Sequence, residues 1–297
     1  MISYIGRNDE KLMGEHNVEN FKYDLSIVAI IKGEESYLDE WITYHKIVGC
    51  SHFYLFDNED DNDKQKIVLE KYVKQGVVTY IPFTGHDKQI EAYDYACKHF
   101  SEETKYMALI DADEFIFSTH GERIDILVDS LFRKYSNYPY LYRKEPAAIG
   151  VNWRMYGTSN HKQRPIGGVL ENFLLRAPDS WEENYHVKNI VNPRCVDQAN
   201  VHYCRYKSGY CCISENGSEI TGPFFPDGRC SLIRINHYRF KSEEEFISRI
   251  ERGWIDPNNE SKQKGSYDLL TTQWKWNAIY DPIALPYIEA INSMRIY

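Results

Sequence analysis

Two aspartates separated by one residue follow an apolar stretch that has the character of a buried strand. Asp111 and Asp113 come directly after Met107–Ile110. Alternate residues of an extended chain point to the same side, so both carboxylates can address one site. Carboxylate oxygens suit Mg²⁺ or Mn²⁺, which are hard ions that keep coordination positions for substrate phosphates. The alternative is a pair of loop acids that caps the following helix, so the surrounding fold must decide.

The segments before these aspartates alternate between strands and helices. The predicted elements, in chain order, are strand Leu25–Ile31, helix Glu35–Val48, strand His52–Phe56, helix Lys66–Gln75, strand Val77–Pro82, helix Ile90–Phe100 and strand Tyr106–Ile110. This alternation predicts an α/β fold with a doubly wound sheet. Ligands of such sheets bind outside the carboxyl ends of the strands. Lys32–Glu34, Asp57–Asn58 and Asp111–Asp113 all follow predicted strands, so we expect them to meet at one site.

The regular alternation ends after Phe117, and the second half is richer in short strands and turns. The expected elements are helix Arg123–Tyr135, strands Ala147–Tyr156 and Glu171–Arg176, short strands within Lys188–Asn236, helix Ser242–Arg252 and a last helix at Pro286–Met294. No low-complexity linker separates the two halves. We therefore expect one domain in two parts, with a nucleotide bound by the first part and an acceptor by the second.

The charge and composition restrict the class of ligand. A formal net charge of -9 disfavours a general affinity for nucleic acid or anionic lipid. A phosphorylated small ligand therefore needs a local cation, either a metal ion or a placed lysine or arginine. The chain holds 24 tyrosines and 6 tryptophans, whose rings pack against the apolar faces of sugars, although most of them are expected to build the core.

The cysteine pattern indicates a reducing compartment, and the apolar runs are too short to predict a transmembrane helix. Seven cysteines occur without a CxxC spacing, so reduced thiols are a better interpretation than structural zinc. The first 24 residues lack the apolar core of a signal peptide, and no apolar run approaches the roughly 20 residues that a transmembrane helix needs. We expect a cytoplasmic protein, either free or in peripheral contact with the inner face of a membrane.

Eight segments of the chain together resemble glycosyltransferase family 92 and its family 2-like relatives. They are Lys32–Glu35, Glu40–His45, Phe53–Asn58, Ala108–Phe115, Asn152–His161, Lys188–Pro193, Val201–Tyr203 and Ile235–Arg239. Their order along the chain makes the resemblance more specific than a single Asp-Ala-Asp triplet. Two positions depart from the family pattern, because Gly33 stands where asparagine is usual and Asn160 where glycine is usual.

The resemblance implies a GT-A fold that binds a UDP-sugar, with galactose favoured. By similarity Asp57 contacts the nucleobase, Asp111 and Asp113 bind the ribose and the metal-diphosphate, and His237 completes the metal site with Mn²⁺ or Mg²⁺. Further roles are expected for Lys188 as a contact of the departing diphosphate and for His202 as a weaker metal candidate. The implied parts are an N-terminal extension at 1–24, a nucleotide-sugar-binding half at 25–120, an acceptor-binding and catalytic half at 121–255 and a packed tail at 256–297.

An inverting transfer also needs a carboxylate that takes the proton of the acceptor hydroxyl. Glu171 is the first candidate, because it follows a glycine pair and resembles an acidic position of the family. Glu182 and Glu183 are rivals. A loop at 157–168, flanked by Trp153, Tyr156 and His161, is expected to contact the acceptor or to close as a lid, and a plain surface hairpin is its alternative.

The expected activity is transfer of a hexose from a UDP-sugar to a glycan or glycolipid acceptor. A sugar-1-phosphate nucleotidyltransferase is a second hypothesis, but Lys32–Ser36 lacks the glycine-rich phosphate loop of that class. A carbohydrate-binding protein without catalytic activity is a third. Such a protein has no need for the acids, yet Asp111, Asp113 and Glu171 are all present.

Overall fold

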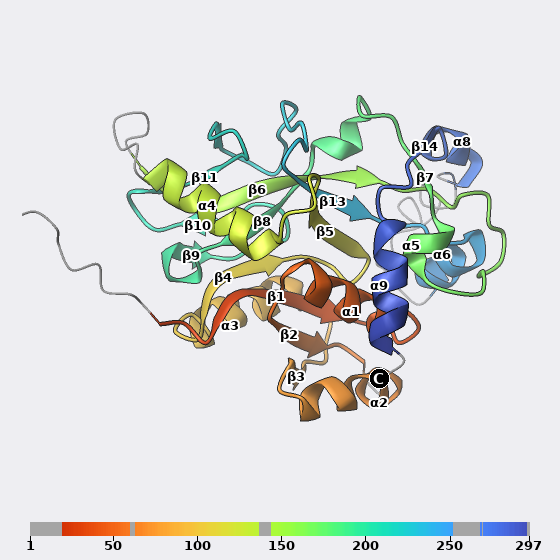
Figure 1. Ribbon diagram of the computed structural model, residues 1–297, viewed down its shortest axis with the longest axis horizontal. Coiled ribbons are helices and arrows are strands. Elements are labelled where there is room, and N and C mark those ends of the chain that lie inside the picture. The colour runs from red at the N-terminus through yellow and green to blue at the C-terminus, as the bar shows by residue number, and fades with distance from the viewer. Residues whose placement is uncertain (1–19, 60–62, 137–143, 252–267, 269, 296–297) are drawn as a thin grey trace, which may run out of the picture.

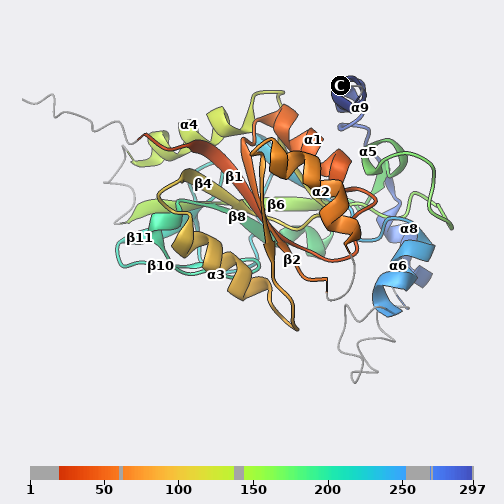
Figure 2. The same ribbon diagram turned by 90° about the horizontal axis from the view of Figure 1, so that it is seen from below.

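A computed structural model of the chain describes residues 20–59, 63–136, 144–251, 268 and 270–295. One large twisted sheet forms the centre, and helices cover both of its faces (Figures 1 and 2). Helices α1 (Leu38–Val48), α2 (Lys64–Lys74) and α4 (Ile124–Ser136) lie on one face, and α3 (Gln89–His99) lies on the other. The apolar core is accordingly divided into two layers, one on each side of the sheet.

The first half forms four parallel strands. They are β1 (Tyr23–Ile31), β2 (His52–Asp57), β3 (Val78–Pro82) and β4 (Thr104–Leu109), in the spatial order β4-β1-β2-β3. All six residues of β2 are buried, as expected for a strand that is covered by helices on both faces. The chain order reverses between β1 and β4, and ligands bind at such switch points. The predicted elements of this half are confirmed, and they place the ends of β1 and β4 side by side.

The second half extends the same sheet instead of forming a separate domain. Strand β8 (Val187–Val191) is antiparallel to both β4 and β6 (Glu145–Met155). Strand β11 (Tyr210–Ile213) follows parallel to β6, and β12 (Glu219–Ile220) closes this edge. The predicted fold class, an α/β fold of the GT-A type with one doubly wound mixed sheet, is confirmed.

A small side sheet connects the residues after Asp113 to the second half. Strand β5 (Glu114–Ser118) pairs antiparallel with β13 (Ile233–His237), and β13 runs parallel to the end of β6. In this register His237 lies opposite Glu114. The histidine of the second half is therefore delivered to the aspartate pair of the first half by strand pairing.

The remaining elements are short. They are α5 (Val169–Asn172), β7 (Leu175–Arg176), the 3₁₀ turns η1 (Glu182–Tyr185) and η2 (Pro193–Cys195), β9 (Val196–Gln198), β10 (Arg205–Tyr206), α6 (Glu243–Arg249), α8 (Gln273–Trp276), β14 (Ile279–Tyr280) and α9 (Pro286–Arg295). The prediction of a strand over Glu171–Arg176 is wrong for its first residues. The carboxylate of Glu40 accepts hydrogen bonds from the backbone N–H groups of Val169 and Leu170, which stabilises a helical turn there.

The described part of the C-terminal tail packs on the domain. Tyr287 of α9 contacts Tyr44 of α1, with ring centroids 5.2 Å apart. Asp281 accepts hydrogen bonds from Arg234 of β13 at 2.7 Å and from Arg176 of β7 at 2.5 Å. Within the described residues, no helix combines the length and the hydrophobicity that crossing a lipid bilayer requires.

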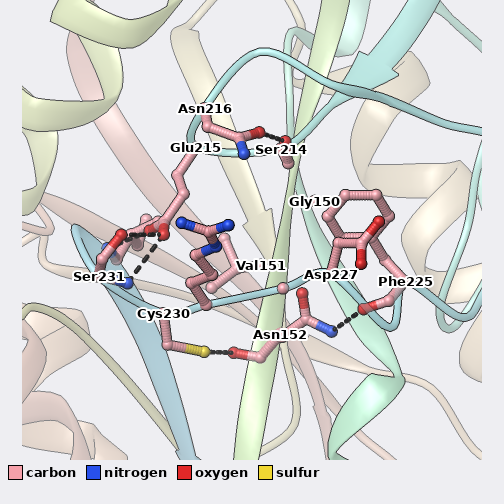
Figure 3. Close-up of a pocket in the computed structure, with 13 residues that line it drawn as sticks. Gly150, Val151, Asn152, Ser214, Glu215, Asn216, Phe225, Asp227, Cys230 and Ser231 are labelled. Carbon is pink, nitrogen blue, oxygen red and sulfur yellow. Dashed lines mark hydrogen bonds between the residues drawn. The ribbon is translucent and has the colours of Figure 1, made fainter.

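A cavity of about 100 Å³ lies beside β6, between the loops at 214–216 and 225–231 (Figure 3). Glu215, one of two carboxylates that line the cavity, accepts four hydrogen bonds. The donors are the backbone N–H groups of Ser231, Leu232 and Ile233 and the hydroxyl of Ser231, at 2.6 to 3.0 Å. Because this carboxylate is fully used in holding the start of β13, we assign the cavity a structural role.

We predict that Glu215→Ala lowers the free energy of unfolding by about 3 kcal/mol, because buried N–H groups lose a charged acceptor. Urea unfolding followed by circular dichroism measures this change. The matched control is Glu219→Ala, whose side chain is 37% exposed and pairs with Lys144 on the surface, and it is expected to change stability by at most about 0.5 kcal/mol. Equal effects of the two substitutions would contradict the assignment.

Candidate active site

The main cavity lies at the carboxyl ends of β1, β2 and β4 and has a volume of about 440 Å³. Lys32 and Asn58 line it after β1 and β2, and Asp111–Asp113 line it after β4. The loop at 85–88 and the start of α3 form another wall, and Arg249 from α6 contributes a cation. The predicted meeting of polar clusters at the strand ends is therefore observed, and the site lies at the switch point between β1 and β4.

Asp111 is held by three side chains. Its Oδ1 atom accepts hydrogen bonds from Gln89 Nε2 at 2.5 Å and from the Tyr93 hydroxyl at 3.1 Å. Its Oδ2 atom lies 2.8 Å from Lys188 Nζ. Burial raises the pKa of Asp111, but the charge of Lys188 outweighs it, so the pKa falls below its ordinary value. Asp111 is thus an ionised and fixed carboxylate.

Asp113 is buried, and one of its oxygens has no hydrogen-bond partner. Oδ2 accepts a hydrogen bond from Arg249 at 2.6 Å, whereas Oδ1 is unpartnered. The nearest imidazole nitrogen, His237 Nε2, is 3.5 Å from Oδ1. Burial raises the pKa of Asp113, but Arg249 and then His237 hold it well below its ordinary value. An ionised oxygen therefore faces an imidazole nitrogen across a short gap.

His237 lies between two carboxylates. Its Nε2 faces Asp113, and its Nδ1 lies 3.8 Å from Oε1 of the fully buried Glu114. Burial lowers the pKa of His237, which favours the neutral imidazole that binds metal ions. The ring also packs against Trp153, with centroids 4.5 Å apart, so its orientation is restrained.

The donor set at Asp113 and His237 fits a divalent cation. Two ligands at right angles, each about 2.1 Å from an ion, stand roughly 3 Å apart, so the observed 3.5 Å needs only a small approach. Among the described residues, no group of three or more His, Cys, Asp or Glu side chains is arranged to hold a metal ion. Two protein ligands suit an ion that takes its other ligands from phosphate oxygens and water.

Two residues predicted to contact the sugar-nucleotide donor are buried and bind other side chains of the protein. Lys188 is fully buried between Asp111 and Glu114, at 2.8 and 3.5 Å, and it does not line the main cavity. Asp57 is also buried, because Oδ1 accepts from Gln65 Nε2 at 2.6 Å and Oδ2 from the Tyr80 hydroxyl at 2.7 Å. Its neighbour Asn58 lines the cavity instead.

Glu171 and Glu183 differ in their relation to the site. Glu171 accepts a hydrogen bond from the N–H of Gly168 at 2.7 Å and caps its own helical turn, away from the main cavity. Glu183 follows Trp181, and its carbonyl oxygen accepts a hydrogen bond from Trp153 Nε1 at 2.6 Å. Since Trp153 packs on His237, the backbone of Glu183 is connected to this histidine through one side chain.

The segment predicted to form a lid is anchored in this structure. Tyr156 is fully buried, and its hydroxyl accepts a hydrogen bond from Arg234 at 2.7 Å, which places it in the core. His161 Nε2 lies 3.1 Å from the carbonyl oxygen of Asn172, and the His161 carbonyl accepts from the N–H of Glu243. Of the three flanking residues, Trp153 alone lies beside a predicted metal ligand.

Several residues of the site were not predicted from the sequence. Gln89 and Arg249 contact the two aspartates, and His86 and Asp87 line the main cavity. The sequence Gly85-His86-Asp87 carries a turn signal, and Gly85 and Asp87 do adopt positive φ angles of 120° and 53°. A turn at the carboxyl edge of the sheet is a signal that could have identified this wall.

His202, the weaker metal candidate, packs with the rings of Trp153 and His186. Its ring lies 5.5 Å from Trp153 and 5.0 Å from His186, measured between centroids. Burial and the nearby charge of Lys188 lower its pKa to about 4. The neutral ring belongs to an aromatic cluster behind His237.

Comparison with solved structures finds distant glycosyltransferases. S. aureus TarS 1-349 in complex with UDP matches with a TM-score of 0.36 and 10% sequence identity, over 76% of this chain and 63% of that one. The mannosyltransferase PcManGT of Pyrobaculum calidifontis, in complex with GDP-Man and Mn²⁺, matches with a TM-score of 0.31 and 11% identity, over 46% and 37%. Both TM-scores are below 0.5, so neither match assigns a role to a residue of this chain.

Sequence comparisons identify the family. Curated relatives include family 92 glycosyltransferases of Ricinus communis, 25% identical over 83% of this chain, and of Arabidopsis thaliana, 22% identical over 83%. The chain spans 41% of the length of each of these two relatives. The model of glycosyltransferase family 92 matches residues 28–218, which is more than half of the chain. The protein therefore belongs to glycosyltransferase family 92.

Proposed function

We propose that the protein transfers a hexose from a UDP-sugar to a glycan or glycolipid acceptor, with inversion and with a divalent cation. The observation that carries this proposal is the unpartnered Oδ1 of Asp113, a residue that lines the main cavity, facing the buried His237. The uridine nucleotide and the preference for galactose come from the family resemblance. The cytoplasmic location is part of the proposal and is supported by seven cysteines without a disulfide.

The main cavity supplies two ends of different chemistry for a nucleotide-sugar. Asn58 and the loop at 85–88 form one end, where we place the nucleoside. Asp113 and Arg249 form the other end, with His237 3.5 Å from Asp113, and we place the diphosphate there. Mn²⁺ or Mg²⁺ held by Asp113 and His237 would neutralise the leaving diphosphate as a Lewis acid. Arg249 adds a fixed positive charge beside it.

Inversion in one displacement requires a base on the acceptor side, and the geometry favours Glu183 over Glu171. The backbone carbonyl of Glu183 accepts a hydrogen bond from Trp153, which packs against His237, so Glu183 lies near this proposed metal ligand. The side chain of Glu183 is 43% exposed and can meet an acceptor from solvent. Glu171 instead uses its carboxylate to cap α5. In this role Glu183 removes the proton of the acceptor hydroxyl as that oxygen bonds to the anomeric carbon.

We predict that Asp113→Ala abolishes Mn²⁺-dependent hydrolysis of UDP-galactose and weakens the binding of Mn²⁺ with UDP at least tenfold, because an ion ligand is lost. Calorimetry and release of UDP measure the two effects. Asp197→Ala is the matched control, since this aspartate lies on the surface in a pair with Arg205. Full activity of the wild-type protein with excess chelator would refute the metal role.

We predict that Glu183→Gln lowers kcat for sugar transfer by about 10²- to 10⁴-fold, the usual contribution of a general base, while UDP-sugar binding is unchanged. Glu171→Gln, tested in parallel, is expected to keep kcat within about threefold and to lower the melting temperature slightly through the lost cap. The reverse pattern would reinstate Glu171 as the base. Initial rates at saturating donor, together with calorimetry, separate these outcomes.

A further inference from the structure

Three buried polar atoms without a hydrogen-bond partner converge on the imidazole of His237. The described part of the chain contains seven such side-chain atoms in all, and these three are Asp113 Oδ1, His237 Nδ1 and Glu114 Oε1. Buried polar atoms are normally paired, so a cluster of unpaired ones requires an explanation. The proposed cation accounts for Asp113 Oδ1 alone, which leaves the other two atoms.

The two remaining atoms face each other. His237 Nδ1 and Glu114 Oε1 are 3.8 Å apart, slightly beyond a hydrogen bond. The antiparallel pairing of β13 with β5 sets His237 opposite Glu114, and Trp153 packs against the ring. On the other side of the ring, His237 Nε2 is directed at Asp113 Oδ1 at 3.5 Å. The ring is therefore aligned between the two carboxylates, with one nitrogen for each.

Glu114 is itself held in place. Its Oε2 accepts a hydrogen bond from the backbone N–H of Asp111 at 3.0 Å and lies 3.5 Å from Lys188 Nζ. Because these contacts use Oε2, the free Oε1 is directed toward His237. A small shift of the ring toward Glu114 would complete the hydrogen bond from Nδ1 to Oε1.

We propose that Glu114 is a positioning residue, which accepts the Nδ1–H of His237 and so keeps the lone pair of Nε2 directed at the cation beside Asp113. The inference rests on the metal site of the proposed function. Histidines that bind metals commonly donate their other N–H to a carboxylate, which fixes the tautomer and increases the basicity of the ligand nitrogen. The residue directly after the Asp-Ala-Asp triplet thus acts on the metal site through a histidine 123 positions later in the sequence.

A purely structural role is the competing explanation, since Glu114 could serve only to neutralise the buried Lys188. The two roles predict different responses. If Glu114 positions His237, replacing Glu114 changes the tautomer of the imidazole. If it only balances charge, replacing Lys188 produces the same changes as replacing Glu114.

The test uses full-length protein with ¹⁵N-labelled histidine, and it measures the His237 tautomer by long-range ¹H–¹⁵N NMR without added metal. We expect the proton on Nδ1 in the wild type and a mixture of tautomers in Glu114→Gln. Electron paramagnetic resonance of free Mn²⁺, in the presence of UDP, is expected to show an affinity about 10- to 100-fold lower in Glu114→Gln. A wild-type proton on Nε2, or an unchanged Mn²⁺ affinity, would overturn the proposal.

Lys188→Gln is the matched control, because it removes the charge pair and leaves Glu114 opposite His237. We expect it to lower stability while the His237 tautomer is retained, and a Glu114-like loss of the tautomer would favour the structural role. Glu114→Asp provides a second variant if Glu114→Gln does not fold. Its shorter side chain is expected to produce the same mixture of His237 tautomers as Glu114→Gln. If the wild type binds no Mn²⁺, the metal role fails, and the tautomer measurement still decides the role of Glu114.

Discussion

Three carboxylates within four residues create the constraint on which the rest of the structure depends. Asp111, Asp113 and Glu114 all follow β4, and Asp113 and Glu114 are shielded from water while Asp111 lines the main cavity. Burying an unpaired carboxylate costs several kcal/mol, so each one needs a cation or a set of donors. The compensating groups are Lys188 from β8 and Arg249 from α6. Both come from the second half. The carboxylates of the first half are therefore compensated only when the two halves are packed together.

The compensating groups give the two aspartates different hydrogen-bond environments. Asp111 uses both oxygens to bind Lys188, Gln89 and Tyr93, and its side chain, 28% exposed, lines the main cavity. Asp113 keeps one oxygen free toward His237. Although alternate residues of an extended chain share a side, the partners that approach from other elements decide which carboxylate stays open. We therefore interpret Asp111 as a fixed carboxylate of the cavity wall and Asp113 as a buried carboxylate with one oxygen left for the proposed cation.

The sequence predicted those parts of the fold and site that depend on local pattern. The strands that carry Asp111 and Asp57 are continuous apolar runs, and their order predicted one site at the strand ends. The partners of these side chains could not be predicted from the sequence. Nothing near Asp57 in the sequence shows that Gln65 and Tyr80 will donate hydrogen bonds to its carboxylate. The same limit applies to Glu171, since the helical turn that it caps depends on Glu40, which is 131 positions earlier.

The proposed site has a further consequence for the order of binding. Two protein ligands leave most of the coordination of a divalent cation to phosphate oxygens and water. The affinities for cation and diphosphate are then coupled, and by thermodynamic linkage each increases the other equally. Arg249, which pairs with Asp113 at 2.6 Å, adds a fixed cation that also favours the diphosphate. In the proposed site the same coupling would make loss of the diphosphate weaken the hold on the cation, so we expect the two to be released together after a transfer.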